Sequence, residues 1–171
     1  MKIILWAEIM ANGFYPHASS ESRGFQTAAE VWADFYQHIA QAGNVIFGRK
    51  TMEEVLAAGG DPHYAKADVV AISRRVSELP GMHCAPSPQQ AIAFLEAKGH
   101  TVAFVGGGET VLNAFLAEGL ADELIFLIPP AIGGREFSVA LPEGQHKDLR
   151  LQSVRELGSG CVKLHYLLER G

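Results

Sequence analysis

Apolar runs and amphipathic segments alternate along the first two thirds of the chain. The runs are short and nearly continuous in apolar residues, which predicts strands buried on both faces. We expect strands at residues 2–9, 44–47, 68–73, 82–85, 101–105 and 123–128. The segments between them carry apolar residues at helical spacing, so we expect helices at 27–42, 51–58, 89–98 and 111–118. This order of elements is typical of a parallel sheet with helices on both faces.

The C-terminal part follows a different pattern. Two further runs, 149–157 and 161–168, flank Gly158-Ser159-Gly160, which predicts an antiparallel hairpin. The predicted fold class is therefore α/β, with a mainly parallel central sheet, helices on both faces and antiparallel C-terminal strands. No repeat, low-complexity tract or linker divides the 171 residues, so we expect residues 1–171 to form one domain.

The starts of two predicted helices carry threonine and glutamate at the spacing of a capping box: Thr27 with Glu30, and Thr51 with Glu54. Before the first of them, residues 14–26 hold a proline, three serines and a glycine. We interpret this segment as a long, partly mobile loop over a site. Residues 131–147, which contain glycines and prolines, are predicted to be irregular.

Charge and composition argue against several kinds of partner. A net charge of −5 disfavours nucleic acid. No apolar run approaches the roughly 20 residues that span a bilayer, and the first residues are typical of a strand rather than a signal peptide. Cys84 and Cys161 lack the spacing of a metal site or disulfide framework, and the histidines are scattered. These features predict a cytoplasmic protein without a metal site, a membrane partner or a nucleic-acid partner.

Three consecutive glycines, Gly106-Gly107-Gly108, stand between a predicted strand and a predicted helix. Glycine lets the backbone approach a ligand closely, and a helix start adds unpaired N–H groups and a positive dipole end. The segment therefore suits a phosphate, and a tight turn that needs positive φ is the alternative. Val111 occupies the place of the third glycine of the dinucleotide fingerprint, and no Gly-Lys-Ser/Thr follows.

Two other predicted strands end in basic or hydroxyl residues. The segments at these two strand ends are Gly48-Arg49-Lys50-Thr51 and Ser73-Arg74-Arg75. At the third strand end, Glu109 and Thr110 follow the three glycines. Since the carboxyl ends of parallel strands meet at one edge, where open α/β sheets bind ligands, we expect these segments to hold one ligand with several phosphates. The alternatives are solvated surface charges at the basic residues and a helix cap at Thr51.

The same segments carry a resemblance to a known family. Val45-Ile46-Phe47-Gly48-Arg49-Lys50-Thr51-Met52, Val70-Ala71-Ile72-Ser73-Arg74 and Phe104-Val105-Gly106-Gly107-Gly108-Glu109, in this order, resemble the dihydrofolate reductase fold family. The stretch from Gly106 through residues 116–124 and Ile128-Pro129 to Gly133-Gly134 is similar to one branch of it. That branch contains the reductase domain of bacterial riboflavin biosynthesis, the RibD C-terminal domain. The resemblance covers essentially the whole chain.

The resemblance implies an oxidoreductase that uses NADPH and transfers hydride to a small substrate. The substrate would be a pyrimidine-like or pterin-like heterocycle, a carbonyl or an imine, similar to that of 5-amino-6-(5-phosphoribosylamino)uracil reductase. Gly48, Arg49, Lys50 and Thr51 would hold phosphates of NADPH. Ser73, Arg74 and Arg75 would lie by the adenosine 2′-phosphate, for which arginines are better suited than the acidic residue expected for NAD. Gly106, Gly107, Gly108, Glu109 and Thr110 would cradle the pyrophosphate, and residues 10–14 would cover the nicotinamide.

The substrate side departs from the family pattern at two places. The pteridine-binding carboxylate of dihydrofolate reductases falls near Val31, and Asn12 replaces the acid of the Ser-Leu-Asp-Gly run of the riboflavin enzymes. The candidate substrate residues are Met10, Asn12, Trp32 and Phe35, with core packing as the alternative for the aromatic ones. The sequence assigns neither the catalytic residue nor the substrate.

Three hypotheses follow. The chain is an NADPH-dependent reductase of a small molecule, a non-catalytic NADPH-binding domain, or a structural module that forms a homodimer through its apolar C-terminal strands. The first and third are compatible with one another.

Overall fold

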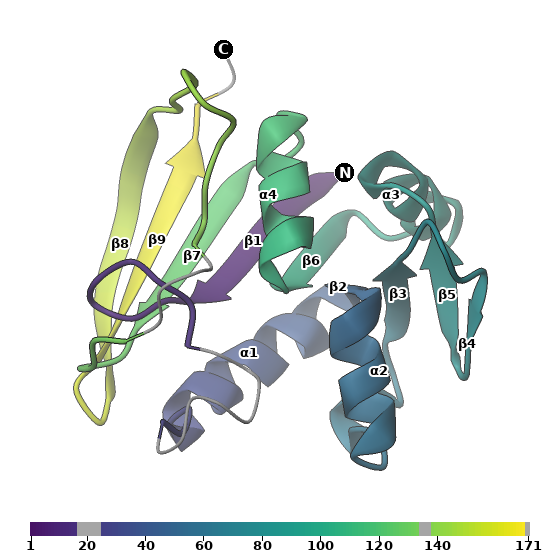
Figure 1. The fold of residues 1–171 in the computed structure, drawn as a ribbon, viewed down its shortest axis with the longest axis horizontal. Helices are drawn as coiled ribbons and strands as arrows, with labels where there is room; N and C mark the ends of the chain where they lie inside the picture. Colours follow the sequence, from purple (N-terminus) through teal and green to yellow (C-terminus); the bar gives the residue numbers. More distant parts are fainter. Residues whose placement is uncertain (17–24, 134–137, 170–171) are drawn as a thin grey trace.

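The computed structural model describes residues 1–16, 25–133 and 138–169. All strands of this part of the chain join one nine-stranded sheet, in the order β4-β5-β3-β2-β6-β1-β7-β9-β8. Figure 1 shows this sheet running from β8 and β9 on the left to β4 on the right. The strands are β1 (Lys2–Glu8), β2 (Asn44–Gly48), β3 (Asp68–Ile72), β4 (Glu78–Leu79), β5 (Met82–Ala85), β6 (Val102–Gly107), β7 (Glu123–Ile128), β8 (Leu149–Gly158) and β9 (Cys161–Leu168). The helices are α1 (Ala29–Ala42), α2 (Arg49–Ala57), α3 (Pro88–Ala97) and α4 (Glu109–Ala117), with a 3₁₀ turn η1 (Pro62–Tyr64).

The central strands run parallel. From β5 through β3, β2, β6 and β1 to β7, each pairs in parallel with its neighbour. The C-terminal strands β9 and β8 add to β7 as an antiparallel pair, so the predicted fold class is confirmed. Sequence analysis missed β4, which pairs antiparallel with β5 at the opposite edge. A strand of two residues is too short to show a periodicity of its own.

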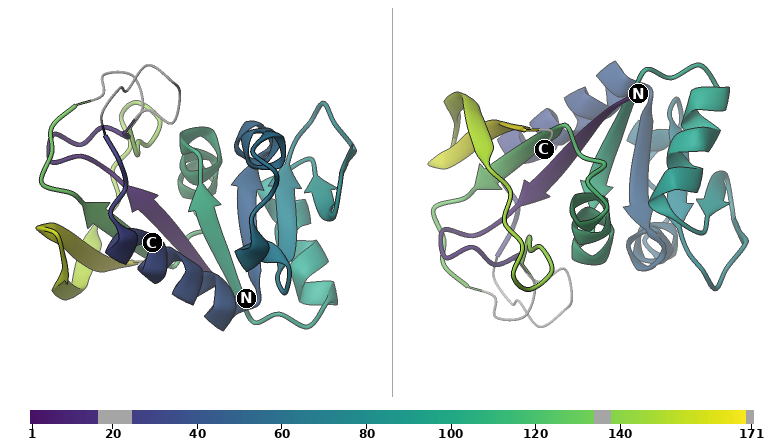
Figure 2. Two further views of the ribbon diagram at one scale, coloured as in Figure 1. Left: turned by 90° about the horizontal axis from the view of Figure 1, so that it is seen from below. Right: turned by 90° about the horizontal axis from the view of Figure 1, so that it is seen from above.

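Helices cover both faces of the sheet, which Figure 2 shows from two sides. Alternate residues of β1 belong to opposite layers, as the pleat of a strand requires. Ile3 and Leu5 are in the core layer of α3 and α4, whereas Ile4 and Trp6 are in the layer of α1 and α2. Burial of one such side chain contributes about 1.5–3 kcal/mol. None of the helices in the described ranges is long and apolar enough to cross a membrane.

Both predicted capping boxes are wrong. Helix α1 begins at Ala29 without a side-chain cap, and Thr27 Oγ1 instead donates a hydrogen bond to Glu8 Oε2 at 2.6 Å. Helix α2 begins at Arg49, two residues earlier than predicted, with Gly48 as its N-cap. Thr51 therefore lies within the first turn of α2 and does not cap it. The hydroxyl of Thr27 is used in a tertiary contact with β1, which local spacing does not reveal.

Candidate functional site

The carboxyl ends of β3, β2 and β6 lie side by side at one edge of the sheet. Strand β2 pairs in parallel with both neighbours, with Gly48 opposite Ile72 and Phe47 opposite Gly107. The segments that follow these strands therefore start at the same edge. The structure thus brings together the three predicted phosphate-binding segments.

The three glycines have different environments. Gly106 and Gly107 belong to β6, so the predicted turn is shorter than expected, and Gly108 alone precedes α4 as its N-cap. A Cβ on Gly106 would lie 2.9 Å from ring atoms of Phe35 and Phe47, so this glycine serves core packing. Gly107 has φ +130°, and a Cβ there would meet no atom within 4 Å. Of these three glycines, Gly107 is the one that combines a conformation suited to glycine with free space beside it.

Two helices of nine residues begin at this edge, and neither has a side-chain cap. Gly48 is the N-cap of α2 and Gly108 is the N-cap of α4. The two N-termini are close together, since a Cβ on Gly108 would lie 3.4 Å from Thr51 Oγ1. The first N–H groups of each helix have no intrahelical partner and carry the positive end of the dipole. The paired N-termini at the glycine strand end are therefore suited to bind phosphate.

The basic residues at this edge differ in whether their charged groups are available to bind a ligand. Arg49 is not free, because its Nη1 binds both carboxylate oxygens of Glu53 at 2.6 and 2.5 Å. Lys50, Arg74 and Arg75 are exposed. Their turn is fixed by Ser73, whose Oγ accepts hydrogen bonds from the backbone N–H groups of Arg75 and Val76 at 3.1 and 2.9 Å. Ser73 thus orders the loop, and the arginines supply its charge.

Glu109 and Thr110 form the first turn of α4. Burial raises the pKa of the Glu109 carboxyl, while a backbone hydrogen bond from Ser138 lowers it in part. Asn113 donates to the backbone oxygen of Ser138 at 3.1 Å and accepts from the N–H of Ala140 at 2.9 Å. Thr110 is exposed. Glu109 and Asn113 therefore hold the segment that begins at Ser138 against α4.

The segment after β1 is tied to the segment after β7. Asn12 Nδ2 donates to the backbone oxygen of Gly133 at 2.9 Å, and Asn12 Oδ1 accepts from the N–H of Gly133 at 3.2 Å. Met10 is buried and packs against the same glycine, with its Sδ 2.8 Å from where a Cβ would be. Phe14 forms a bridge with Ser138. These contacts give Met10 and Asn12 a structural role, and residues 17–24 of the predicted mobile loop lie outside the described residues.

The two aromatic substrate candidates have opposite environments. Phe35 is 2% exposed and packs against Trp6, Phe47 and Phe104, so it belongs to the core beneath Gly106. Trp32 is 43% exposed and stacks on Tyr36 with ring centroids 5.8 Å apart. Of these two residues, Trp32 is the one that offers surface to a ligand.

Sequence analysis missed two buried polar groups close to this edge. Among the described residues, Glu8 Oε1 and Tyr15 Oη are the buried side-chain atoms that lack a hydrogen-bond partner. Glu8 ends β1 and is 8% exposed; burial raises the pKa of its carboxyl, and the hydrogen bond from Thr27 partly opposes this. The signal available in the sequence was a single carboxylate at the end of an apolar strand.

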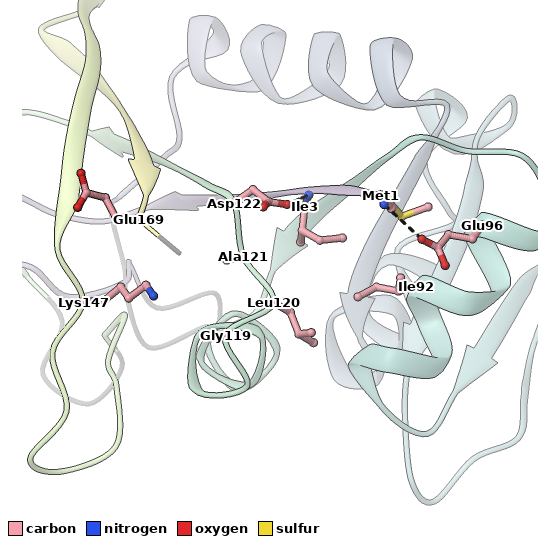
Figure 3. A pocket seen from close by; sticks show the side chains of 10 residues that line it. All are labelled: Met1, Ile3, Ile92, Glu96, Gly119, Leu120, Ala121, Asp122, Lys147 and Glu169. Atoms are coloured by element: carbon pink, nitrogen blue, oxygen red, sulfur yellow. Dashed lines mark hydrogen bonds and ion pairs between the residues drawn. The ribbon is translucent and has the colours of Figure 1, made fainter. Parts of the chain in front are cut away.

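A cavity of about 540 Å³ lies at the opposite, amino end of β1 (Figure 3). Its lining includes the carboxylates of Glu96, Asp122 and Glu169 but only one lysine, Lys147. Asp122 Oδ2 accepts a hydrogen bond from the N–H of Ile3 at 2.9 Å, and Glu96 binds the amino group of Met1 at 3.3 Å. This acidic lining disfavours phosphate, so we place the candidate site at the glycine edge. Within the described ranges, no group of three or more His, Cys, Asp or Glu side chains is arranged to hold a metal ion.

Comparisons with known proteins agree with this architecture. A sequence model of the RibD C-terminal domain matches residues 68–163. No curated protein matches the chain. A solved structure from Shewanella sp. PV-4, provisionally assigned to riboflavin biosynthesis, superposes with a TM-score of 0.75 at 18% identity, over 99% of this chain and 100% of the other.

Two further solved structures have the same fold. RibD from Acinetobacter baumannii gives a TM-score of 0.73 at 17% identity, over 99% of this chain but 58% of its own. A pyrimidine reductase-like protein from Corynebacterium diphtheriae gives 0.72 at 16% identity, over 99% and 92% of the two chains. At these identities the likeness establishes the fold, and the chain spans little more than half of the RibD chain.

Proposed function

Because the chain belongs to the RibD C-terminal domain family, we propose that it is an NADPH-dependent reductase of a small heterocyclic, carbonyl or imine substrate. Membership confirms the family resemblance inferred from the sequence and supports a reductase-like role. The observation that carries the proposal is the juxtaposition of three parallel strand ends, two uncapped helix N-termini and the free space at Gly107.

The residues at the glycine edge fit a nicotinamide dinucleotide. The N-termini of α2 and α4 would bind the pyrophosphate oxygens, and Gly107 would allow close approach because it has no side chain. Lys50 adds an exposed cation beside the α2 N-terminus. When bound, NADPH would supply the hydride, whereas the protein orients the reactants and excludes water.

The exposed arginines after β3 favour NADPH over NADH. Arg74 and Arg75 lie in the turn that Ser73 fixes, at the edge where the adenosine end of the nucleotide would be held. A guanidinium can bind a 2′-phosphate with two parallel, charge-assisted hydrogen bonds. We therefore assign recognition of the 2′-phosphate to Arg74, with Arg75 as its neighbour.

Thermal unfolding with each nucleotide tests this assignment. We expect NADPH to raise the melting temperature far more than NADH, and Arg74→Ala to weaken NADPH binding roughly tenfold, equivalent to about 1.4 kcal/mol, while leaving NADH unchanged. Lys66→Ala, which removes an exposed cation between η1 and β3, is the control and should behave as the wild type. Equal protection by the two nucleotides would refute the 2′-phosphate site.

A non-catalytic NADPH-binding homodimer is the second candidate. It is favoured by the structural use of Asn12, whose amide is occupied by Gly133, and by the buried Val31 at the place of the family's pteridine-binding acid. Oxidation of NADPH with a panel of pyrimidine, pterin, carbonyl and imine compounds separates the two. The panel should include 5-amino-6-(5-phosphoribosylamino)uracil, and binding of NADPH without turnover on any member would favour the second candidate.

A further inference from the structure

Strand β1 ends in a buried carboxyl group with one unsatisfied oxygen. Oε2 of Glu8 accepts the hydroxyl of Thr27 at 2.6 Å, but Oε1 has no partner and almost no solvent contact. The other buried polar residue of the described core, Asn44, is fully bonded to the backbones of Ala42, Val102 and Phe104. Because buried polar atoms are nearly always hydrogen-bonded, an unpaired carboxyl oxygen is an exception that points to a functional role.

The position of Glu8 places this oxygen at the candidate site. Leu5 of β1 pairs with Val105 of β6, so Glu8, three residues further on, lies at the height of Gly107 and Gly108. Along β1, even-numbered residues Ile4 and Trp6 face α1 and α2, and the bond to Thr27 just before α1 puts Glu8 on this face too. Phe35, beneath Gly106, belongs to the same layer.

The other acidic and phenolic groups around this edge are already engaged or are weak acids. Burial also raises the pKa of Glu109, but its carboxyl accepts hydrogen bonds from the backbone N–H of Ser138 and from Asn113 Nδ2. Both carboxylate oxygens of Asp34 are already engaged, by Lys163 Nζ and by the indole Nε1 of Trp6. Glu30 is partly exposed and accepts from Ser159 Oγ at 3.1 Å. Burial and the charge of Glu109 raise the pKa of Tyr15 above its usual value, so this phenol is a weak acid.

We propose that Glu8 is the catalytic acid of this site, which donates its carboxyl proton to the substrate atom that gains an electron pair on reduction. This inference rests on the proposed function. NADPH, when bound, would supply hydride to the carbon of the C=N or C=O group and would leave as NADP⁺. The π electron pair of that group would move to its nitrogen or oxygen, which would take the proton of Glu8, and the Glu8 carboxylate would recover a proton from water.

The surroundings of Glu8 favour the protonated form of its carboxyl group. Burial raises its pKa, and the hydrogen bond from Thr27 is the opposing contribution. From β9, the thiol of Cys161 is the titratable group that interacts with Glu8. Burial, and the Glu8 carboxylate where it is ionised, raise the pKa of Cys161 to about 11, so the thiol is neutral at neutral pH. Glu30 and Asp34, on α1, act on the same thiol. Among the described residues, the groups that perturb the pKa of Glu8 include no cation.

Infrared spectroscopy tests the protonation state without any substrate. The difference spectrum of wild type minus Glu8→Gln should show the carbonyl band of a protonated carboxylic acid at neutral pH, and Glu30→Gln should leave that band in place. A Glu8 that is ionised at neutral pH would overturn the proposal. Glu8→Gln retains an oxygen for the Thr27 hydroxyl, and Glu8→Asp provides a second variant if the amide impairs folding.

Single-turnover oxidation of NADPH with 5-amino-6-(5-phosphoribosylamino)uracil tests the chemical step. Glu8→Gln should slow this step about 100-fold or more, the usual range for loss of a general acid, and remove the pH dependence that the acid imposes. Glu8→Asp should retain part of the rate, and thermal protection by NADPH should not change in either variant. An unchanged rate and pH profile in Glu8→Gln would also overturn the proposal.

The two arms separate failure of this inference from failure of the proposed function. If NADPH gives the wild type no thermal protection, the proposed function fails, and the inference fails with it. If NADPH protects but this uracil is not reduced, the substrate is a different one, and the infrared band decides whether Glu8 is retained as the acid.

Discussion

The raised pKa of Glu8 makes the stability of the folded protein depend on pH. Its carboxyl is buried at the end of β1 with one oxygen unsatisfied. Burial raises its pKa above the ordinary value of 4.5, so the folded protein binds this proton more tightly than the unfolded chain does. The stabilisation is complete below the unfolded value and is lost as the pH rises through the folded value.

Glu8→Gln should therefore flatten the pH dependence of stability. Measured by denaturant unfolding, the free energy of unfolding of the wild type should decline as the pH rises from below 4.5 through the raised pKa, and the variant should decline less. Glu30→Gln, the same change on a partly exposed carboxylate of α1, should keep the slope of the wild type. Parallel curves for wild type and Glu8→Gln would mean that the pKa of Glu8 is not raised.

At the scale of elements, the Glu53 carboxylate of α2 would compete with a phosphate at the N-terminus of the helix for the guanidinium of Arg49. Arg49 is the first residue of α2 and forms an i, i+4 ion pair with Glu53 one turn later. The pair is partly exposed, with side chains 24% and 42% accessible, so it contributes at most about 1 kcal/mol. A phosphate at the α2 N-terminus would have to draw the guanidinium away from this carboxylate.

Glu53→Gln should therefore tighten nucleotide binding. Release of Arg49 should improve the affinity for NADPH and NADH alike by about two- to fivefold, which corresponds to about 0.4–1 kcal/mol. Isothermal titration with each nucleotide measures this effect. Glu54→Gln, the exposed neighbour on the same helix, removes an equal charge without touching Arg49 and should change the affinity less. Equal gains in both variants would reflect net charge rather than release of Arg49.

The elements also show what sequence patterns can and cannot predict. The parallel strands and their helices were predictable because continuous apolar runs reflect burial on both faces, and the common edge followed from parallel geometry alone. The start of α1 was not predictable, because the hydroxyl of Thr27 bonds to Glu8 of β1 and does not cap the helix. The extension of β6 through Gly106 depends on pairing with β2 and on the rings of Phe35 and Phe47, and the isolation of Glu8 Oε1 depends on packing that no local pattern encodes.

At the scale of the whole molecule, β8 leaves one side of the sheet open. It pairs with β9 alone, and its Leu149, Leu151 and Val154 are 39%, 52% and 56% exposed. An exposed edge strand with apolar side chains is a template for pairing with another chain. The proposed homodimer would pair through this strand.

Leu151→Lys should shift the protein toward a monomer, because a charge at the centre of the paired surface would have to be desolvated. Sedimentation velocity over a concentration series measures the change. Ile132→Lys, which alters a side chain that is 80% exposed but lies outside β8, should leave the assembly intact. A wild-type protein that sediments as a monomer at all concentrations would rule out the proposed dimer.

The double hydrogen bond between Asn12 and Gly133 couples two segments beside the proposed site. It fastens residues 10–14, which follow β1, to residues 131–133, more than a hundred residues later in the chain. Any displacement of residues 10–14 would have to carry residues 131–133 along or break both bonds, at about 0.5–1.5 kcal/mol each. If the proposed cover over the nicotinamide moves to admit a reactant, the two segments would therefore move together.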